Sequence, residues 1–396
     1  MSDTQSSTDE LTFSLVRHDP WFRLQRAVGL IPANGQGIIR RCLVFALVTW
    51  VPLAIWALYW RRAFPGVIAE PLLQHFGVHV RCLLGIPMLV IAEIAGNMIP
   101  QDFVRYFVTS GLVPDDARPR FVKILRSTEG LRDAWPAWAT ILGIVLLVGT
   151  IDPGNSTHQH ELVWATEDVA GQTGFGFAGW WFLHVLRPLI TALLLVWVWR
   201  LAVCVVLLWR ISRLDLHLVP THPDRTGGLG FLEDFPIIFS PVIFALSAVL
   251  ASRWGHDVFY HGVDVYSFAI PFAVFVSLML ILFLGPLVLF ARRLHHFKRR
   301  GVRDYGALVG QHGRLVRRRW ISREPIPESP LLQAAELGPV IDTVSMYEVV
   351  EQIRPAPIGK QSLLAVLLPA LIPMLPVIAI QIPLKDILIG LLKTLI

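Results

Sequence analysis

The chain has 396 residues, of which 54% are hydrophobic and only 16% are charged, and its formal net charge is +6. A soluble domain of this composition would expose large apolar patches, so the composition excludes a soluble globular protein and predicts a polytopic membrane protein. The first 41 residues are polar and basic and lack a short apolar core followed by a cleavage site, so we expect no removable signal peptide.

Seven apolar runs are long enough to cross ~30 Å of hydrocarbon as helices, which takes ~20 residues each. They are Cys42 to Trp60, Leu83 to Ile99, Trp135 to Ile151, Trp180 to Trp209, Leu232 to Ala251, Phe268 to Ala291 and Ser362 to Ile380. The fourth run exceeds one crossing, so it is expected to tilt or to project from the bilayer. The predicted fold is an all-α polytopic bundle of about seven spans.

The distribution of Lys and Arg predicts the orientation, because basic loops resist translocation. Basic residues crowd the N-terminal segment, the loop after the second span and residues 292–360, whereas Asp152 to Gly179 contains neither Lys nor Arg. We therefore expect a cytoplasmic N-terminal segment (1–41), a six-span bundle (42–291), a basic cytoplasmic segment (292–360), and a last span with a short external tail (361–396). Whether Leu384 to Ile396 re-enters the membrane stays open.

The parts outside the spans give further expectations. Asp115 to Arg132 and Pro339 to Ile353 place apolar residues on one face and are predicted cytoplasmic helices. The basic segment is expected to attract anionic lipids. We expect no nucleic-acid partner, and a homo-oligomer remains an open alternative. Cys42, Cys82 and Cys204 lie in or beside apolar runs and are predicted to be buried free thiols.

The most polar loop, Leu216 to Phe231, lies between the fourth and fifth spans and carries several chemically capable residues: His217, His222, Asp224, Arg225, Gly227 and Gly228. A phosphate cradle is one reading, which Glu233 and Asp234 oppose. A metal site, with His295 and His296 added, is a second. In a third, structural reading, Asp224 and Arg225 pair or cap helix ends while the glycines permit a tight turn.

Two stretches carry a resemblance, and a third follows them. They are ThrHisProAspArgThrGlyGlyLeuGlyPheLeu at 221–232 and MetTyrGluValValGluGlnIleArgProAlaProIle at 346–358, which is followed by an apolar run and IleProLeuLysAspIleLeu at 382–388. They resemble motifs of a widespread family of bacterial multi-pass integral membrane proteins. The resemblance implies residence in a bacterial inner membrane. It implies no activity and no catalytic residue.

Ionisable side chains within the apolar runs are the next candidates, because each costs ~2.5–3.5 kcal/mol at bilayer depth and normally faces a partner. Asn97 shares a helix face with Glu93, and His184 lies three residues before Arg187. Arg187 and Arg200 are expected to point in different directions, with Arg200 structural. Glu93, Asn97, His184 and Arg187 are the predicted pathway-lining residues, and the alternative is an interhelical ion pair.

The segments expected outside hold a further group of imidazoles and carboxylates: His158, His160, Glu161, Glu167, Asp168, His256, Asp257, His261 and Asp264. Such groups suit zinc, copper or manganese. The competing interpretation is a solvated acidic loop, so metal binding stays open.

The sequence favours transport or conduction of an ion or small solute, because charges inside a polytopic bundle most often mark a pathway. A membrane-embedded enzyme with a His/Asp site at the cytoplasmic mouth is one alternative, and a signalling or assembly protein is another. The sequence assigns no substrate, cofactor or catalytic residue.

Overall fold

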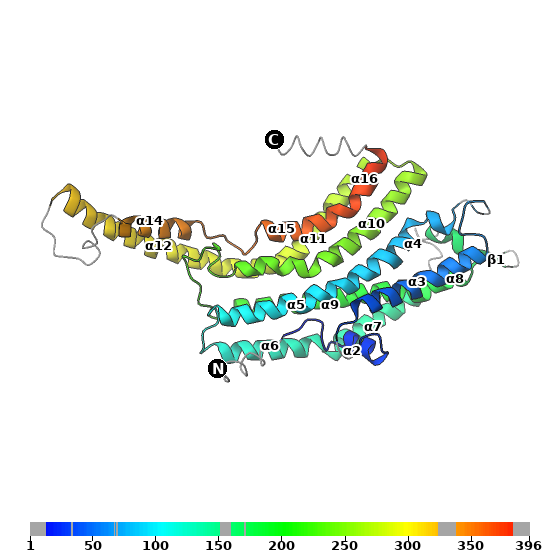
Figure 1. Ribbon diagram of the computed structural model, residues 1–396, viewed down its shortest axis with the longest axis horizontal. Helices are drawn as coiled ribbons and strands as arrows, with labels where there is room; N and C mark the ends of the chain where they lie inside the picture. Colours follow the sequence, from blue (N-terminus) through cyan, green and yellow to red (C-terminus); the bar gives the residue numbers. More distant parts are fainter. Residues whose placement is uncertain are drawn as a thin grey trace.

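Seven helices are long and apolar enough to cross a membrane within the residues that the computed structural model describes, which are 13–32, 35–66, 68, 70–150, 160–169, 172–323 and 338–382 (Figure 1). They are Ile38–Tyr59, Phe76–Thr109, Arg118–Thr150, Phe177–Ser212, Gly230–His261, Val265–Ile321 and Lys360–Gln381. The number of predicted spans is confirmed, and the chain has the architecture of a multi-pass membrane protein.

The spans are assembled from shorter elements. The first half contains α2 (Pro20–Ala27), α3 (Ile38–Tyr59), η1 (Leu72–Gln74), α4 (Phe76–Val80), η2 (Arg81–Gly85), α5 (Ile86–Thr109), α6 (Arg118–Arg132), α7 (Trp135–Thr150), η3 (His160–Ala165), β1 (Thr166–Val169), β2 (Gln172–Phe175), α8 (Phe177–Trp181) and η4 (Phe182–Leu186). The second half contains α9 (Arg187–Ser212), η5 (Gly230–Phe239), α10 (Ser240–His261), η6 (Val265–Phe268), α11 (Ala269–Leu284), η7 (Gly285–Phe290), α12 (Ala291–Val316), η8 (Arg317–Ile321), α14 (Gly338–Glu351), α15 (Lys360–Leu371), η9 (Ile372–Met374) and α16 (Leu375–Gln381).

Proline explains where the spans change helical type. Pro87 and Pro188 lie two residues after the π-helical turns η2 and η4, and neither proline has an N–H group to donate to the preceding turn. The wider π turn absorbs the missing hydrogen bond without ending the span. The 3-10 segment η7 begins at Gly285–Pro286 for the same reason.

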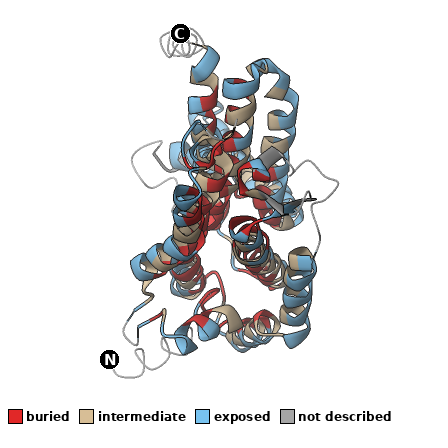
Figure 2. Cartoon of the chain, turned by 90° about the vertical axis from the view of Figure 1, so that its right-hand side faces the viewer, coloured by how far each residue is buried: buried red, intermediate tan, exposed pale blue. Residues whose placement is uncertain are grey.

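The amount of buried surface separates central from peripheral spans. In the most apolar stretch of the span containing α10, 61% of the residues are buried, against only 6% in the span containing α7. Leu142, Leu146 and Leu147 of α7 are more than half exposed, and exposed residues cover the outward faces of the bundle (Figure 2). An apolar outward face of this kind suits contact with lipid rather than water.

The bundle has two distinct ends (Figure 1). At one, which we call the basic end, α12 and α14 pack together and extend past the ends of α5 and α6. At the other, the hairpin end, β1 and β2 form an antiparallel hairpin with Thr166 opposite Phe175, and β2 packs against α8. The predicted helices at Asp115 to Arg132 and Pro339 to Ile353 are confirmed as α6 and α14, whereas the hairpin was not predicted. Cys82 and Cys204 are buried free thiols as predicted, and Cys42 is partly buried.

Candidate functional site

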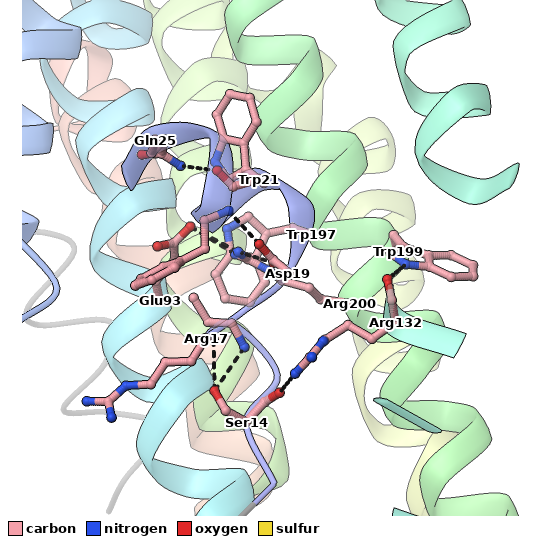
Figure 3. A network of polar contacts seen from close by, with 12 residues as sticks. Ser14, Arg17, Asp19, Trp21, Gln25, Glu93, Arg132, Trp197, Trp199 and Arg200 are labelled. Atoms are coloured by element: carbon pink, nitrogen blue, oxygen red, sulfur yellow. Dashed lines mark hydrogen bonds and ion pairs between the residues drawn. The ribbon is translucent and has the colours of Figure 1, made fainter. Parts of the chain in front are cut away.

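Four buried charged side chains meet inside the bundle, and we call Asp19, Arg41, Glu93 and Arg200 the buried charge network (Figure 3). Glu93 of α5 lies between two arginines, with its Oε2 2.5 Å from Arg41 Nη1 and its Oε1 3.1 Å from Arg200 Nη1. Arg200 Nη2 lies 2.8 Å from Asp19 Oδ2. Two positive and two negative charges make the network formally neutral, which is the condition under which buried ions are tolerated.

Neutral side chains complete the environment of these ions. Gln25 Oε1 accepts a hydrogen bond from Arg41 Nε at 2.6 Å. The Arg200 guanidinium carbon lies 4.8 Å from the ring centroid of Trp197, a cation–π contact. Asp19 also caps α2, because its Oδ1 accepts the Phe22 N–H at 2.6 Å. The network therefore joins α3, α5 and α9 to the chain segment before the first span.

The N-terminal segment is fastened at a second point (Figure 3). Ser14 Oγ donates to Asn97 Oδ1 at 2.9 Å, and Arg132 Nη1 donates to the Ser14 carbonyl. The Arg132 carbonyl in turn accepts the indole N–H of Trp199 at 3.1 Å. Residues 13–31 thus pack into the bundle by specific polar contacts.

The structure brings together only part of the predicted pathway set. Glu93 and Asn97 lie on one face of α5 as expected, and Asn97 meets Ser14. His184 is exposed, stacks on Trp180 with ring centroids 5.1 Å apart, and hydrogen-bonds to the Trp180 carbonyl.

Arg187 precedes Arg200 by 13 residues, or about 20 Å along a helix. Glu93 forms ion pairs with Arg41 and Arg200, and the pathway-lining role expected of Glu93 and Arg187 stays a prediction. Asp19 and Arg41 lie in or beside the polar N-terminal segment, where no hydropathy signal marks them as buried.

In the loop at 216–231, Asp224 organises the backbone around itself. Its carboxylate accepts the N–H groups of Thr226 at 2.8 Å, Gly228 at 3.0 Å and Gly230 at 2.7 Å. Partial burial on its own raises the pKa of Asp224, but these hydrogen bonds outweigh burial and hold that pKa below its usual value. The carboxylate occupies the N–H groups that a phosphate cradle would need.

The backbone conformation and the close packing of this loop explain why it contains glycines. Gly227 and Gly228 have φ angles of +70° and +103°, where other residues are strained. A Cβ on Gly230 would approach Asp224 Cβ to 2.8 Å. Arg225 also has a positive φ, of +56°. The structural reading of the loop, with a tight glycine turn around an aspartate, matches these contacts, although Asp224 binds backbone N–H groups rather than Arg225.

Arg354 holds this loop from a distant part of the chain. Its backbone N–H donates to the Arg225 carbonyl at 2.7 Å, and its Nη2 donates to the Asp224 carbonyl at 2.9 Å. The same guanidinium forms an ion pair with Glu233. The two stretches that carry the sequence resemblance are therefore in direct contact.

The two loop histidines contact different parts of the chain. The backbone N–H of His217 donates to the Leu112 carbonyl at 2.8 Å, whereas the ring nitrogen Nδ1 of His222 lies 2.9 Å from Asp224 Oδ1. Because the Asp224 carboxylate already accepts three backbone hydrogen bonds, its remaining capacity for a metal ion or a proton is small. The contacts of this loop hold chain segments together.

The hairpin end carries a different kind of cluster. A pocket of about 390 Å³ opens between η1–α4 and the end of α10, and we call it the hairpin-end pocket; its polar lining residues are His75, Arg81, Ser252, Arg253, His256, Asp257 and His261. Glu70 lies beside it, with Oε1 4.0 Å from His261 Nε2 and Oε2 3.8 Å from His75 Nε2. The rings of His75 and His256 stack with centroids 5.3 Å apart.

Glu70, His256 and His261 form the one group of three possible metal ligands that the described part of the chain brings together, with ligand atoms within 4.8 Å of one another. His256 Nδ1 lies 3.1 Å from the Gln74 carbonyl. A carbonyl only accepts, so in the neutral form of the ring Nδ1 carries the proton and Nε2 has the lone pair. Hydrogen bonding of the second ring nitrogen to a carbonyl is typical of metal-binding histidines.

Sequence analysis identified His256, Asp257 and His261 but missed Glu70 and His75, which lie in a short connection without a motif. His158 lies outside the described residues, and no side-chain position is described for His160, Glu161, Glu167 or Asp168. Their expected contribution to a metal site stays a prediction.

No family model, no curated protein and no solved structure matches this chain. Function is therefore inferred from the chemistry of its own side chains.

Proposed function

We propose that this chain is an integral membrane protein that binds a divalent transition-metal ion at its hairpin end through Glu70, His256 and His261. The observation that supports this is the convergence of two imidazoles and one carboxylate from separate segments. Two histidines and a glutamate form a ligand set that zinc accepts, and they leave a fourth position for water or a substrate. Imidazole also suits copper, and carboxylate suits manganese.

The three ligand atoms must move closer together to bind one metal ion. Bonds of about 2.0–2.2 Å at tetrahedral zinc place ligand atoms about 3.3–3.6 Å apart, whereas the three ligand atoms here lie within 4.8 Å of one another. The His261 side chain is 47% exposed and so has room to turn toward Glu70.

Equilibrium dialysis of the purified protein against zinc, copper and manganese tests this proposal. Wild-type protein should retain about one equivalent of at least one metal, and the pair Glu70→Gln and His256→Gln should abolish retention. His184→Gln is the matched control, because it removes an exposed histidine that does not line the pocket. Absence of retained metal in wild type, or equal losses in the control, would refute metal binding, provided that thermal melting shows all variants folded.

Transport of the bound ion is a second, further-reaching part of the proposal. One observation favours it: the span that lines the pocket with Arg81 continues through the π turn η2 to Glu93, about 18 Å further along. π turns within spans frequently occur at functional sites. Glu93 is sealed between Arg41 and Arg200, so passage of an ion requires the network to open.

Flux into proteoliposomes that contain a metal-sensitive dye separates transport from binding alone. Transport predicts time-dependent entry of the retained metal in wild type and none in the Glu70→Gln and His256→Gln variant. Stoichiometric binding without entry would exclude transport and would leave a metal-binding membrane protein. Residence in a bacterial inner membrane, which the sequence resemblance implies, belongs to the same proposal.

A further inference from the structure

A second hollow adjoins the hairpin-end pocket on the side of the bundle. It has a volume of about 560 Å³ and lies between α4–η2, α10 and η9–α16. Its lining is apolar apart from His79 and Ser252, and it includes Leu84, Phe244, Ala248, Ala251, Gly255, Phe259, Ile372, Pro373, Pro376, Val377 and Ile380. We call it the apolar groove.

Small residues and prolines shape the two walls of the groove. Ala248, Ala251 and Gly255 follow one another at intervals of three and four residues, so they lie on one face of α10 and present little volume. On the opposite wall, Pro373 and Pro376 lie in the first turns of η9 and α16, where the last span changes helical type. The small residues are buried, and a Cβ on Gly255 would lie 3.5 Å from Val377 Cγ2, so the groove runs beside this close contact between α10 and α16.

The groove is long enough for an acyl chain. Phe244 and Phe259 both line it and are 15 residues apart on one helix, which corresponds to about 22 Å. One leaflet contributes about 15 Å of a ~30 Å hydrocarbon core. Because the lining is apolar and the walls belong to membrane-spanning helices, a hydrocarbon chain is the ligand that matches this length and chemistry.

The groove and the hairpin-end pocket adjoin, because Phe76 and Ser252 line both. Arg81 and Arg253 line the pocket close to this junction. Arg81 Nη1 and Ser252 Oγ both approach the open position above Gly77, at 3.6 and 4.0 Å from where a Cβ would lie. Two guanidinium groups and one hydroxyl therefore lie beside the apolar groove.

We propose that the hairpin-end pocket and the apolar groove form one binding site for an anionic phospholipid. Its phosphate lies at Arg81 and Arg253, and one acyl chain occupies the groove. Guanidinium groups bind phosphate through paired N–H donors. Asp257 lines the same pocket, and its carboxylate repels headgroups that carry a high negative charge. This site does not depend on metal binding.

The test measures binding of fluorescent phosphatidylglycerol and phosphatidylcholine to the purified full chain in detergent with a chelator present. Wild type should bind phosphatidylglycerol at least tenfold more tightly than phosphatidylcholine. The double variant Arg81→Gln and Arg253→Gln should lose that preference, whereas Arg105→Gln with Arg120→Gln, exposed arginines that do not line the pocket, should keep it. The chelator separates this outcome from that of the metal proposal.

Two further arms identify the source of the phosphate and the role of the groove. Ile372 is 48% exposed at the groove, so Ile372→Trp should narrow the groove without entering the core and should weaken binding of both lipids. Inorganic phosphate at millimolar concentration should not displace phosphatidylglycerol. Equal binding of the two lipids by wild type, an unchanged preference in the Arg81 and Arg253 variant, or displacement by phosphate alone would overturn the proposal.

Discussion

Replacing Asp19 by Asn tests whether the buried charge network is stabilised by its neutrality. The substitution leaves Arg41 and Arg200 facing only Glu93, so one positive charge becomes uncompensated in a site where the side chains are at most 2% exposed. Removing one partner of a buried ion pair costs about 3–5 kcal/mol. Asn rather than Ala keeps an acceptor for the Phe22 N–H, so loss of the helix cap contributes little.

A double-mutant cycle separates charge from packing. Arg200→Gln alone leaves one excess negative charge, whereas Asp19→Asn together with Arg200→Gln restores neutrality. The double variant should therefore be more stable than the sum of the single losses by about 2–3 kcal/mol, the upper part of the range for residues in direct contact. Loss of the Trp197 contact is common to both Arg200 variants and cancels in the cycle.

The assay is unfolding in mixed detergent and dodecyl sulfate micelles, followed by tryptophan fluorescence. The matched control is the exposed pair Arg293 and Asp215, whose atoms are 2.7 Å apart but whose aspartate is 97% exposed. Asp215→Asn should change stability little, because solvent screens exposed pairs. Additive losses for Asp19→Asn and Arg200→Gln, or an equally large loss for Asp215→Asn, would refute the reasoning.

Three further predictions concern the loop around Asp224. Because the pKa of Asp224 is lowered in the folded protein, its carboxylate stabilises the fold at pH values above its usual pKa of 3.8, and this contribution is lost as the pH falls through the lower pKa of the folded state. Wild type should therefore be about 1–3 kcal/mol more stable than Asp224→Asn at pH 7, and thermal melts in acid should show no difference between them. Gly359→Ala should destabilise the protein in thermal melts, because the new Cβ would collide with the Glu233 carboxylate, whereas Gly130→Ala, in open space, should not. Arg354→Lys should speed proteolysis within residues 216–231, because an ammonium lacks the planar fork that reaches both the Asp224 carbonyl and Glu233.

The spans were predictable because the bilayer imposes length and hydropathy on each segment separately. The first span, Cys42 to Trp60, is α3 with four more residues at its start, since a helix continues past the hydrocarbon boundary where hydropathy ends. The changes of helical type within two spans follow from Pro87 and Pro188, but hydropathy is averaged along a whole span and does not reveal them. The β hairpin has strands of four residues each, too short for alternation to stand out.

The sequence could predict which site residues lie together only where those residues belong to one helix. Spacing placed Glu93 and Asn97 on one face of α5, but the partners of Glu93 come from α3 and α9, and no spacing rule connects separate helices. Asp19 is polar within a polar segment, so its burial depends on the whole bundle. Glu70 likewise joins His256 only because the connection before α4 folds against the end of α10.

X-ray absorption of the zinc-loaded protein tests the proposed metal site most directly. The proposed site should give a first shell of nitrogen and oxygen at about 2.0–2.2 Å with two imidazoles, and one imidazole should be lost in His261→Gln. A sulfur shell at about 2.3 Å, which would come from cysteine, or a shell unchanged in His261→Gln would contradict it.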